Sequence, residues 1–118
     1  MIGTHQTPWG YYQITDSGPG FVTMRIEIDP KQELSPYSNK CRQIAWTVVR
    51  GHAEVILDDH TLTLKTGDTF HIPKRAEYRL FNRMEKPLII VAVQTWEYSL
   101  SHLTRFENAY GRCQEIKA

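Results

Sequence analysis

Five histidines are the residues of this chain best suited to metal or acid–base chemistry. They are His5, His52, His60, His71 and His102. Imidazole is a common ligand of transition metals and titrates near neutral pH. No two of the five form an H-x-H or H-x-x-x-H pair, so we expect lone histidines without a ligand role. Only His71, on an expected strand beside Pro73, is a candidate to enter a protein interior.

The two cysteines, Cys41 and Cys113, are a second possible source of chemistry. They form neither a CxxC pair nor any zinc-ligand spacing. Two thiols in a cytosolic chain are usually reduced, so we expect no disulfide. No His motif accompanies either cysteine, and neither is an obvious nucleophile.

Length and charge restrict the class of protein. The 118 residues suit one domain with one core, here residues 1–118. Fourteen basic and thirteen acidic residues leave a net charge of +1, which predicts no nucleic-acid or membrane partner. The longest apolar run, residues 88–93, is far shorter than the ~20 residues of a membrane span. With no recognisable signal peptide, we expect a cytoplasmic protein.

Any site in this chain must be positioned by short segments in which apolar and polar residues alternate, and turn residues separate these segments. We expect strands at residues 24–28, 44–50, 53–57, 62–65, 69–72, 78–81 and 88–95, with an edge strand at 11–15. Residues 31–42 lack periodicity and are expected to form a loop. Residues 101–108 are expected to form a short helix, with Ser101 as its N-cap. Many short strands indicate a β-sandwich or barrel.

Residues 67–82 resemble the second cupin motif. Gly67, Pro73 and Asn82 fall at the spacing of that motif, whereas Tyr78 replaces its histidine and Arg75 replaces a glycine. The first motif of the family ends in a glutamate, six residues and a glycine. Gly51 matches that glycine, and Ile44 then occupies the position of the glutamate.

The flanking segments resemble one cupin branch, the mannose-6-phosphate isomerase domain of bifunctional type II isomerase/mannose-1-phosphate guanylyltransferase enzymes. They are PWG at 8–10, SGPGF at 17–21, WTVVRG at 46–51, VQT at 93–95, RFE at 105–107 and YGR at 110–112. The resemblance spans roughly residues 7–112. It implies an all-β fold, a small cupin barrel (a double-stranded β-helix or jelly roll) with a short C-terminal helix.

The resemblance also implies a divalent metal such as zinc, held inside the barrel. The ligand positions of the family fall on Tyr37, Asn39, Ile44 and Tyr78, or on Ser38 and Lys40 after a one-residue slip in the loop. None is a histidine, and an isoleucine at a carboxylate position removes charge that a cation needs. We therefore expect no metal and no other cofactor.

A barrel without metal can still bind a small molecule. The candidate ligand-binding residues are Tyr37, Asn39, Arg42, Trp46, Tyr78, Arg79 and Gln94. Arg42 and Arg79 match family arginines, and a guanidinium suits the phosphate of a sugar phosphate. The alternatives stay open: Trp46 and Tyr78 as core packing, and the two arginines as solvated charges.

Three functions remain in view, and whether the protein is an enzyme stays open. The first is a stand-alone, metal-free cupin of carbohydrate metabolism that binds a sugar phosphate or another small polar ligand. The second is an active, metal-dependent mannose-6-phosphate isomerase with rearranged ligands. The third is a structural or regulatory partner of a sugar-nucleotide enzyme.

The resemblance further implies a homodimer formed by pairing of edge strands. The aromatic residues Trp9, Tyr11, Tyr12 and Trp96 are more than the surface of a small monomer needs. They either contribute to that interface or cover the open end of the barrel itself.

Overall fold

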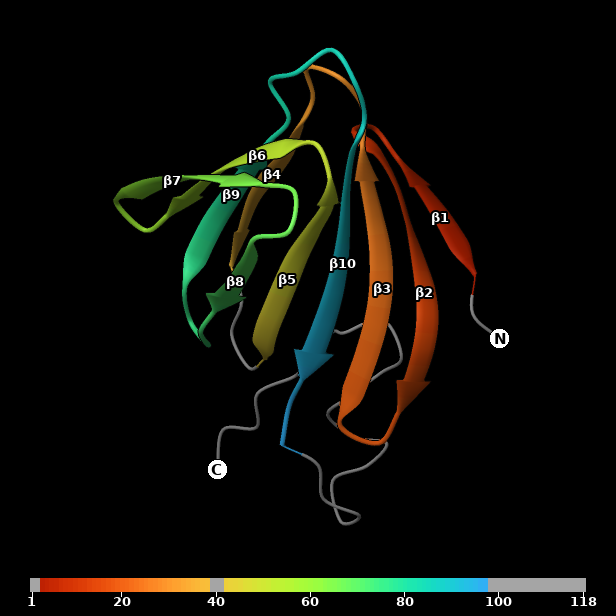
Figure 1. The fold of residues 1–118 in the computed structure, drawn as a ribbon. Coiled ribbons are helices and arrows are strands. Elements are labelled where there is room, and N and C mark those ends of the chain that lie inside the picture. Colours follow the sequence, from red (N-terminus) through yellow and green to blue (C-terminus); the bar gives the residue numbers. More distant parts are fainter. Residues whose placement is uncertain (1–2, 39–41, 98–118) are drawn as a thin grey trace.

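The computed structural model describes residues 3–38 and 42–97, with side chains described for all of these except 35–38 (Figure 1). The expected helix at 101–108 lies outside the described residues, as do Asn39, both cysteines and His102. Nothing described is a helix, so the described part contains no helix long and apolar enough to cross a bilayer. The strands are β1 (Thr4–Thr7), β2 (Gly10–Gly18), β3 (Phe21–Ile28), β4 (Glu33–Ser38), β5 (Gln43–Arg50), β6 (His52–Leu57), β7 (His60–Lys65), β8 (Thr69–Ile72), β9 (Glu77–Phe81) and β10 (Leu88–Thr95).

The strands form two antiparallel sheets that face each other, as the alternating segments predicted (Figure 1). The six-stranded sheet has the order β1-β2-β3-β10-β5-β8, and the four-stranded sheet has the order β4-β9-β6-β7. Because chain neighbours β5 and β6 lie in different sheets, the chain crosses between the sheets at Gly51. Its φ of 103° is a conformation that glycine adopts at little cost.

The core lies between the two sheets and follows from the two-residue period of the strands. On β5, Ile44, Trp46 and Val48 are 1%, 2% and 0% exposed, while Val49 is 41% exposed. The inward residues of β3, β6, β9 and β10 join the same cluster. Full burial of one such side chain contributes about 1.5–3 kcal/mol to stability, so this shared interior holds the two sheets together.

Strand β4 corrects the loop expected at residues 31–42. It pairs with β9, matching Leu34 with Leu80 and Tyr37 with Tyr78, and its register shifts between these pairs. The irregularity, which includes Pro36, removes the regular alternation that would have revealed a strand. Proline is tolerated because β4 is at the edge of its sheet.

The N-terminal strands also differ from expectation. No strand was expected before residue 11, but β1 pairs with β2, and the His5 ring stacks on Tyr12 at a centroid distance of 4.8 Å. The expected edge strand at 11–15 is the longer β2, which lies between β1 and β3. The four residues of β1 are all polar and show no alternation of apolar and polar side chains. Only the pairing with β2 therefore defines this strand.

Two motif residues have structural roles. Gly10, in the Pro-Trp-Gly motif, has φ 148°, and a Cβ there would collide with the carbonyl oxygen of Glu27. Asn82 is 1% exposed, and its amide nitrogen lies 2.9 Å from the carbonyl oxygen of Ile28 and 2.8 Å from that of Lys86. Asn82 thus ties the β9–β10 connection to the end of β3.

Candidate functional site

A buried arginine is the main chemical feature of the interior. Arg42 immediately precedes β5 and is 3% exposed. It continues the inward alternation of Ile44 and Trp46 along that strand. Among the described residues, the buried polar or charged side chains are Arg42 and Asn82. Arg42 therefore brings a positive charge into a mainly apolar interior.

Side chains on β3, on β10 and just after β10 meet near this arginine. Its Nη1 donates a hydrogen bond to Gln94 Oε1 at 3.3 Å, and its Cζ lies 3.8 Å from the centroid of the Trp96 ring. The Gln94 amide nitrogen contacts Met24 Sδ at 3.9 Å. We call Arg42, Gln94, Trp96 and Met24 the arginine cluster. It combines a cation, an amide and an indole at one end of the interior.

The backbone fixes the members of the arginine cluster. Gln94 on β10 pairs with Ile44 on one side and with Val22 of β3 on the other. Just after β10, the Trp96 N–H donates to the carbonyl oxygen of Gly20 at 3.0 Å, which holds the indole over the guanidinium. The indole Nε1 is buried and has no acceptor among the described residues.

Trp46 and Tyr78 form the aromatic wall of the interior. Their rings meet edge to face, with centroids 5.3 Å apart and an interplanar angle of 81°. Trp46 also faces Phe70 of β8 at 6.4 Å. Both Trp46 and Tyr78 belong to the core cluster, so they pack the core; ligand contact by either remains a prediction.

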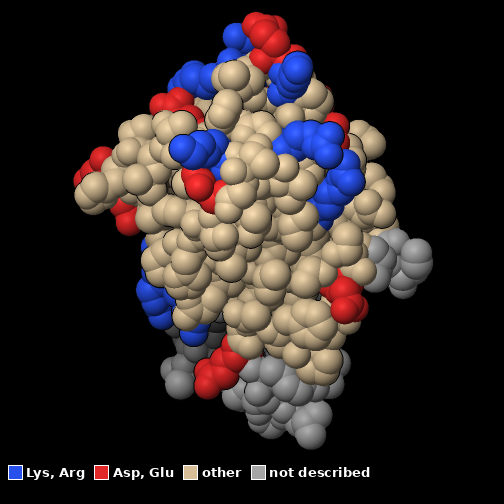
Figure 2. Space-filling view, viewed as in Figure 1, with Lys and Arg blue, Asp and Glu red and all other residues tan. Residues whose placement is uncertain are grey.

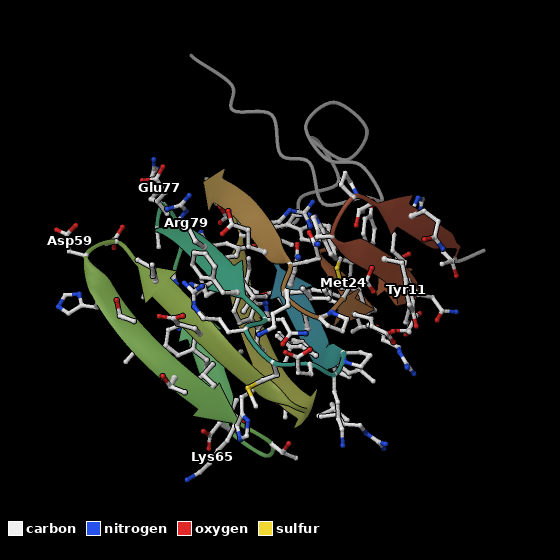
Figure 3. All side chains as sticks on the ribbon, turned by 90° about the horizontal axis from the view of Figure 1, so that it is seen from above. Tyr11, Met24, Asp59, Lys65, Glu77 and Arg79 are labelled. Carbon is white, nitrogen blue, oxygen red and sulfur yellow. The ribbon has the colours of Figure 1, made fainter. Side chains whose placement is uncertain are left out.

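The structure separates Arg79 from the other predicted site residues. Arg79 lies between inward-facing Tyr78 and Leu80 on β9, so its own side chain points outward and is 44% exposed. Its Nη2 lies 4.0 Å from Glu33 Oε2. Figure 3 shows Arg79 beside Glu77 on the outside of the molecule, away from Met24. Arg79 therefore lies outside the arginine cluster, in the position of the alternative that the sequence left open, a solvated charge beside a carboxylate.

A surface hollow of about 400 Å³ lies elsewhere on the molecule. It is lined by Lys31, Gln32, Glu33, Phe81, Asn82 and Arg83. Its cations are paired with nearby carboxylates: Lys31 Nζ lies 3.1 Å from Glu85, and Arg83 contacts Glu54. These contacts make the hollow a weaker candidate than the arginine cluster.

Comparison with known proteins decides the family. A family model described as "Mannose-6-phosphate isomerase C-terminal" matches residues 2–108. This chain belongs to the mannose-6-phosphate isomerase C-terminal family. It is 35% identical over 112 residues to the alginate biosynthesis protein AlgA of Pseudomonas syringae pv. tomato, covering 94% of this chain and 23% of AlgA. It is 37% identical over 106 residues to the xanthan biosynthesis protein XanB of Xanthomonas campestris pv. campestris, covering 89% and 23%.

Solved structures support the fold of this family member. An RmlC-like cupin from Shewanella frigidimarina superposes with a TM-score of 0.70 at 17% identity, covering 82% of this chain and 86% of that one. The predicted cupin fold is therefore confirmed. The chain spans less than a quarter of the length of AlgA and XanB, so their whole activities are not transferred to it.

The described residues of this isomerase-family domain do not fit a divalent metal. Ile44, at the carboxylate position of the family, is 1% exposed and lies between Gln94 and Ile72. Tyr78 occupies the position of the second-motif histidine. Within residues 3–38 and 42–97, no three His, Cys, Asp or Glu side chains cluster as metal ligands would. The side chain of Tyr37 lies outside the described part of the structure, and so do the whole residues Asn39 and Lys40.

The described histidines of this domain are not placed as ligands. His52, His60 and His71 are exposed. His71, the one candidate for the interior, points outward from β8, and its Nε2 lies 2.8 Å from Gln43 Oε1. Successive residues of a strand point to opposite faces, so His71 points outward because its neighbour Ile72 is buried.

Two members of the arginine cluster were missed as site residues by the sequence analysis. Trp96 was noted only as aromatic surface, and Met24 only as part of a strand. A signal existed for Trp96, because it stands two residues after Gln94 and therefore continues the same side of the strand. Met24 required the tertiary structure, since only sheet order brings β3 beside β10.

Proposed function

We propose that this domain binds a sugar phosphate, or another small polar anion, at the arginine cluster, without a resident metal. The observation that carries the proposal is the burial of Arg42 inside the barrel. Taking a charged group out of water costs several kcal/mol unless interactions compensate it. Gln94 and Trp96 contribute to that compensation, and a guanidinium that they hold in a fixed orientation is suited to bind an anion.

The chemistry of the guanidinium favours a phosphate. Its planar donors match two oxygens of a phosphate or carboxylate at once. The Trp96 ring stacked on Arg42 at 3.8 Å restricts the plane of that fork. Gln94 holds Nη1 from the side, at 3.3 Å. Such support lowers the entropy that the arginine loses when it binds an anion.

The neighbouring groups suit the rest of a sugar phosphate. The buried Trp96 Nε1–H is a second donor in the arginine cluster. The Gln94 amide both donates and accepts hydrogen bonds, as sugar hydroxyls require. Trp46 and Tyr78 provide apolar ring surface deeper in the interior. Tyr37 and Asn39 remain predicted contacts from the neighbouring segment.

The absence of a resident metal is part of the proposal and is supported by the donor chemistry. Ile44 and Tyr78 offer no imidazole or carboxylate at two of the family positions. Divalent transition metals prefer imidazole, thiolate or carboxylate ligands. Elemental analysis of the purified full chain should find well under one equivalent of zinc or manganese. One bound equivalent would contradict this part of the proposal.

Calorimetric titration tests binding at the arginine cluster. We expect mannose 6-phosphate to bind the full chain more tightly than mannose. Arg42→Gln should weaken that binding by about tenfold to a hundredfold, since a hydrogen bond to a charged group contributes about 1.5–3 kcal/mol. Arg42→Lys should lose part of the affinity because it keeps the charge but not the fork.

Arg79→Gln is the matched control, because Arg79 is a family-matched arginine that faces solvent. Its affinity should stay within about twofold of the unmodified protein. An equal loss in both variants, or no binding of any sugar phosphate, would overturn the proposal. Conversion of mannose 6-phosphate to fructose 6-phosphate that a chelator abolishes would instead support the alternative, a metal-dependent isomerase.

A further inference from the structure

The surface hollow of about 400 Å³ lies where two connections of the chain meet. They are residues 29–32, between β3 and β4, and residues 82–87, between β9 and β10, and Figure 1 shows both at the top of the molecule. Strand β10 begins there at Leu88, whereas Gln94 of the arginine cluster lies six residues further along it, roughly 20 Å away. The hollow is therefore separate from the site of the proposed function.

Two buried residues, Phe81 and Asn82, line the bottom of the hollow, and they are 8% and 1% exposed. The backbone N–H of Asn82 donates to the carbonyl oxygen of Gln32 at 2.9 Å. Its side-chain amide nitrogen lies 3.1 Å from the carbonyl oxygen of Asp29 and 2.8 Å from that of Lys86. Asn82 thus joins the two connections, so the fold itself fixes the walls of the hollow. A ligand does not have to order them when it binds.

Each charged group that lines the hollow already has a counter-charge. The pairs are Lys31 with Glu85 at 3.1 Å, Glu33 with Arg79 at 4.0 Å, and Arg83 with Glu54. Figure 2 shows positive and negative side chains intermixed at the top of the molecule. An ion entering the hollow would compete with these pairs and would meet groups of its own sign. The same pairing that weakens the hollow as an anion site thus favours a ligand without net charge.

The polar groups around the hollow can both donate and accept hydrogen bonds. Gln32 is exposed, and its amide offers donors and an acceptor. The Glu33 carboxylate accepts only, with more than one lone pair on each oxygen. Arg83 donates only, and its contact with Glu54 uses Nε, which leaves the Nη donors. Because every hydroxyl group donates and accepts, such a mixture suits a ligand rich in hydroxyl groups.

Lys31, at the rim of the hollow, has a backbone conformation that lysine seldom adopts. Its φ is 65°, and the N–H of Gln32 donates to the carbonyl oxygen of Asp29 at 3.2 Å, which closes a turn around Pro30 and Lys31. A positive φ at the third residue of a turn favours glycine. Strain of this kind is often found at binding sites, and here it places an ammonium group beside the hollow.

We propose that the hollow binds a neutral saccharide, a ligand of a different class from the anion proposed for the arginine cluster. Its volume is within the range of about 300–1,000 Å³ that small-ligand pockets have. Sugar hydroxyls would bind Gln32, Glu33 and Arg83, and the apolar carbons of a sugar ring would cover Phe81. This site does not depend on whether the arginine cluster binds a sugar phosphate.

Nuclear magnetic resonance titration of the full chain, labelled with nitrogen-15, tests the proposal. The probes are maltose, cellobiose and mannobiose, each up to about 50 mM. We expect at least one of them to shift the backbone amides of Gln32, Asn82 and Arg83 and the side-chain amide of Gln32, with millimolar affinity. The indole resonance of Trp96 should stay in place. Mannose 6-phosphate should shift that indole resonance instead, so failure of one proposal is distinguishable from failure of the other.

The charge of the preferred ligand is tested with three compounds that share one ring, namely glucose, glucuronate and glucosamine. Because the charges of the hollow are already paired, glucose should shift the Gln32 side-chain amide at least as strongly as either charged compound at the same concentration. Stronger shifts with glucuronate or glucosamine would show an ion site and would overturn the proposal.

Gln32→Leu should weaken saccharide binding at least fivefold, because it removes a donor and an acceptor with little change in size. Gln6→Leu is the matched control, since Gln6 is exposed on β1 and does not line the hollow. Circular dichroism should show both variants folded. Equal affinities of the two variants would overturn the proposal, as would the absence of shifts with all three disaccharides or shifts centred on Trp96.

Lys31→Gly separates binding from stability. Glycine adopts a positive φ without strain, so this variant should be at least as stable as the unmodified protein in urea unfolding. It should nevertheless bind the disaccharide at least twofold more weakly, because the rim loses its ammonium group. Weaker binding in a protein of equal or greater stability would support the proposal, and undiminished binding would contradict it.

Discussion

The inner and outer faces of β10 both carry aliphatic side chains, yet their surroundings differ. Leu88, Ile90 and Ala92 lie on the inner face, and Ile89, Val91 and Val93 lie on the outer face. The inner face is closed over by the four-stranded sheet, and Val48 and Ile90 are fully buried there. On the outer face, Val49 and Val91 keep about 40% of their surface exposed. Alternation alone therefore does not tell which apolar face forms the core.

This difference shows which face is expected to stabilise the fold. Hydrophobic stabilisation is roughly proportional to the apolar area removed from water. The inner face gains it when the chain folds. The outer face gains less of it, because its valines keep about 40% of their surface exposed. Substitutions on the inner face should therefore change the free energy of unfolding more than those on the outer face.

The largest expected effect comes from a charge on the inner face. Ile44→Glu should lower the free energy of unfolding by about 5 kcal/mol at pH 8, through lost packing and burial of a carboxylate. Burial raises the pKa of this carboxyl in the folded state. Stability should therefore be less impaired at pH 4 and should fall as pH rises from about 4.3 through the raised value. Urea unfolding at both pH values measures this.

Gln43→Glu is the matched control, because Gln43 is the exposed neighbour of Ile44 on the same strand. Its effect should be under about 0.5 kcal/mol, with little dependence on pH between 5 and 8. An Ile44→Glu protein as stable as the control would show that the inner face is hydrated. Stabilisation of the unmodified protein by zinc would contradict the expectation that a metal site is absent.

Removing an aromatic side chain from the inner face should have the next largest effect. Trp46→Ala deletes the ring that contacts Tyr78 and Phe70. We expect a loss of about 3–5 kcal/mol in unfolding free energy. Val49→Ala, on the outer face of β5, should cost less than about 1 kcal/mol at 1 µM protein. Similar losses for the two variants in urea unfolding would break the distinction between the faces.

The most direct comparison uses adjacent valines. Val48→Thr and Val49→Thr make the same nearly isosteric change on opposite faces of β5. Val48→Thr should destabilise the monomer by about 1–3 kcal/mol, since a hydroxyl enters the dry core. Val49→Thr should change monomer stability by less than about 0.5 kcal/mol. Chemical unfolding at low protein concentration measures both, and the opposite ranking would reverse the assignment of inside and outside.

Much of the fold could be predicted from the sequence. Segments 44–50 and 88–95 were predicted within a residue of β5 and β10, because their β-branched content and turn boundaries are strong local signals. Strands β1 and β4 were missed. Pairing with β2 and β9 stabilises them, and that information is not local.

The candidate site was predictable only in part. Family resemblance pointed to Arg42, but the sequence left open whether its side chain faces the interior. Arg79 lies between Tyr78 and Leu80, so strand alternation should have placed it outside. The contact of Arg42 with Trp96 could not be foreseen, since it depends on a backbone hydrogen bond from Trp96 to Gly20 after the strand has ended.

The sequence by itself determined the strand periodicity and the family, and it predicts that Ile44 and Tyr78 stand at family ligand positions. These properties reside in residue identity and spacing along the chain. Only the tertiary structure decided that Arg42 is buried beneath Trp96 and that one apolar face of β10 is left open. Both depend on which strands become neighbours, because burial is a property of what packs against a side chain rather than of the side chain alone.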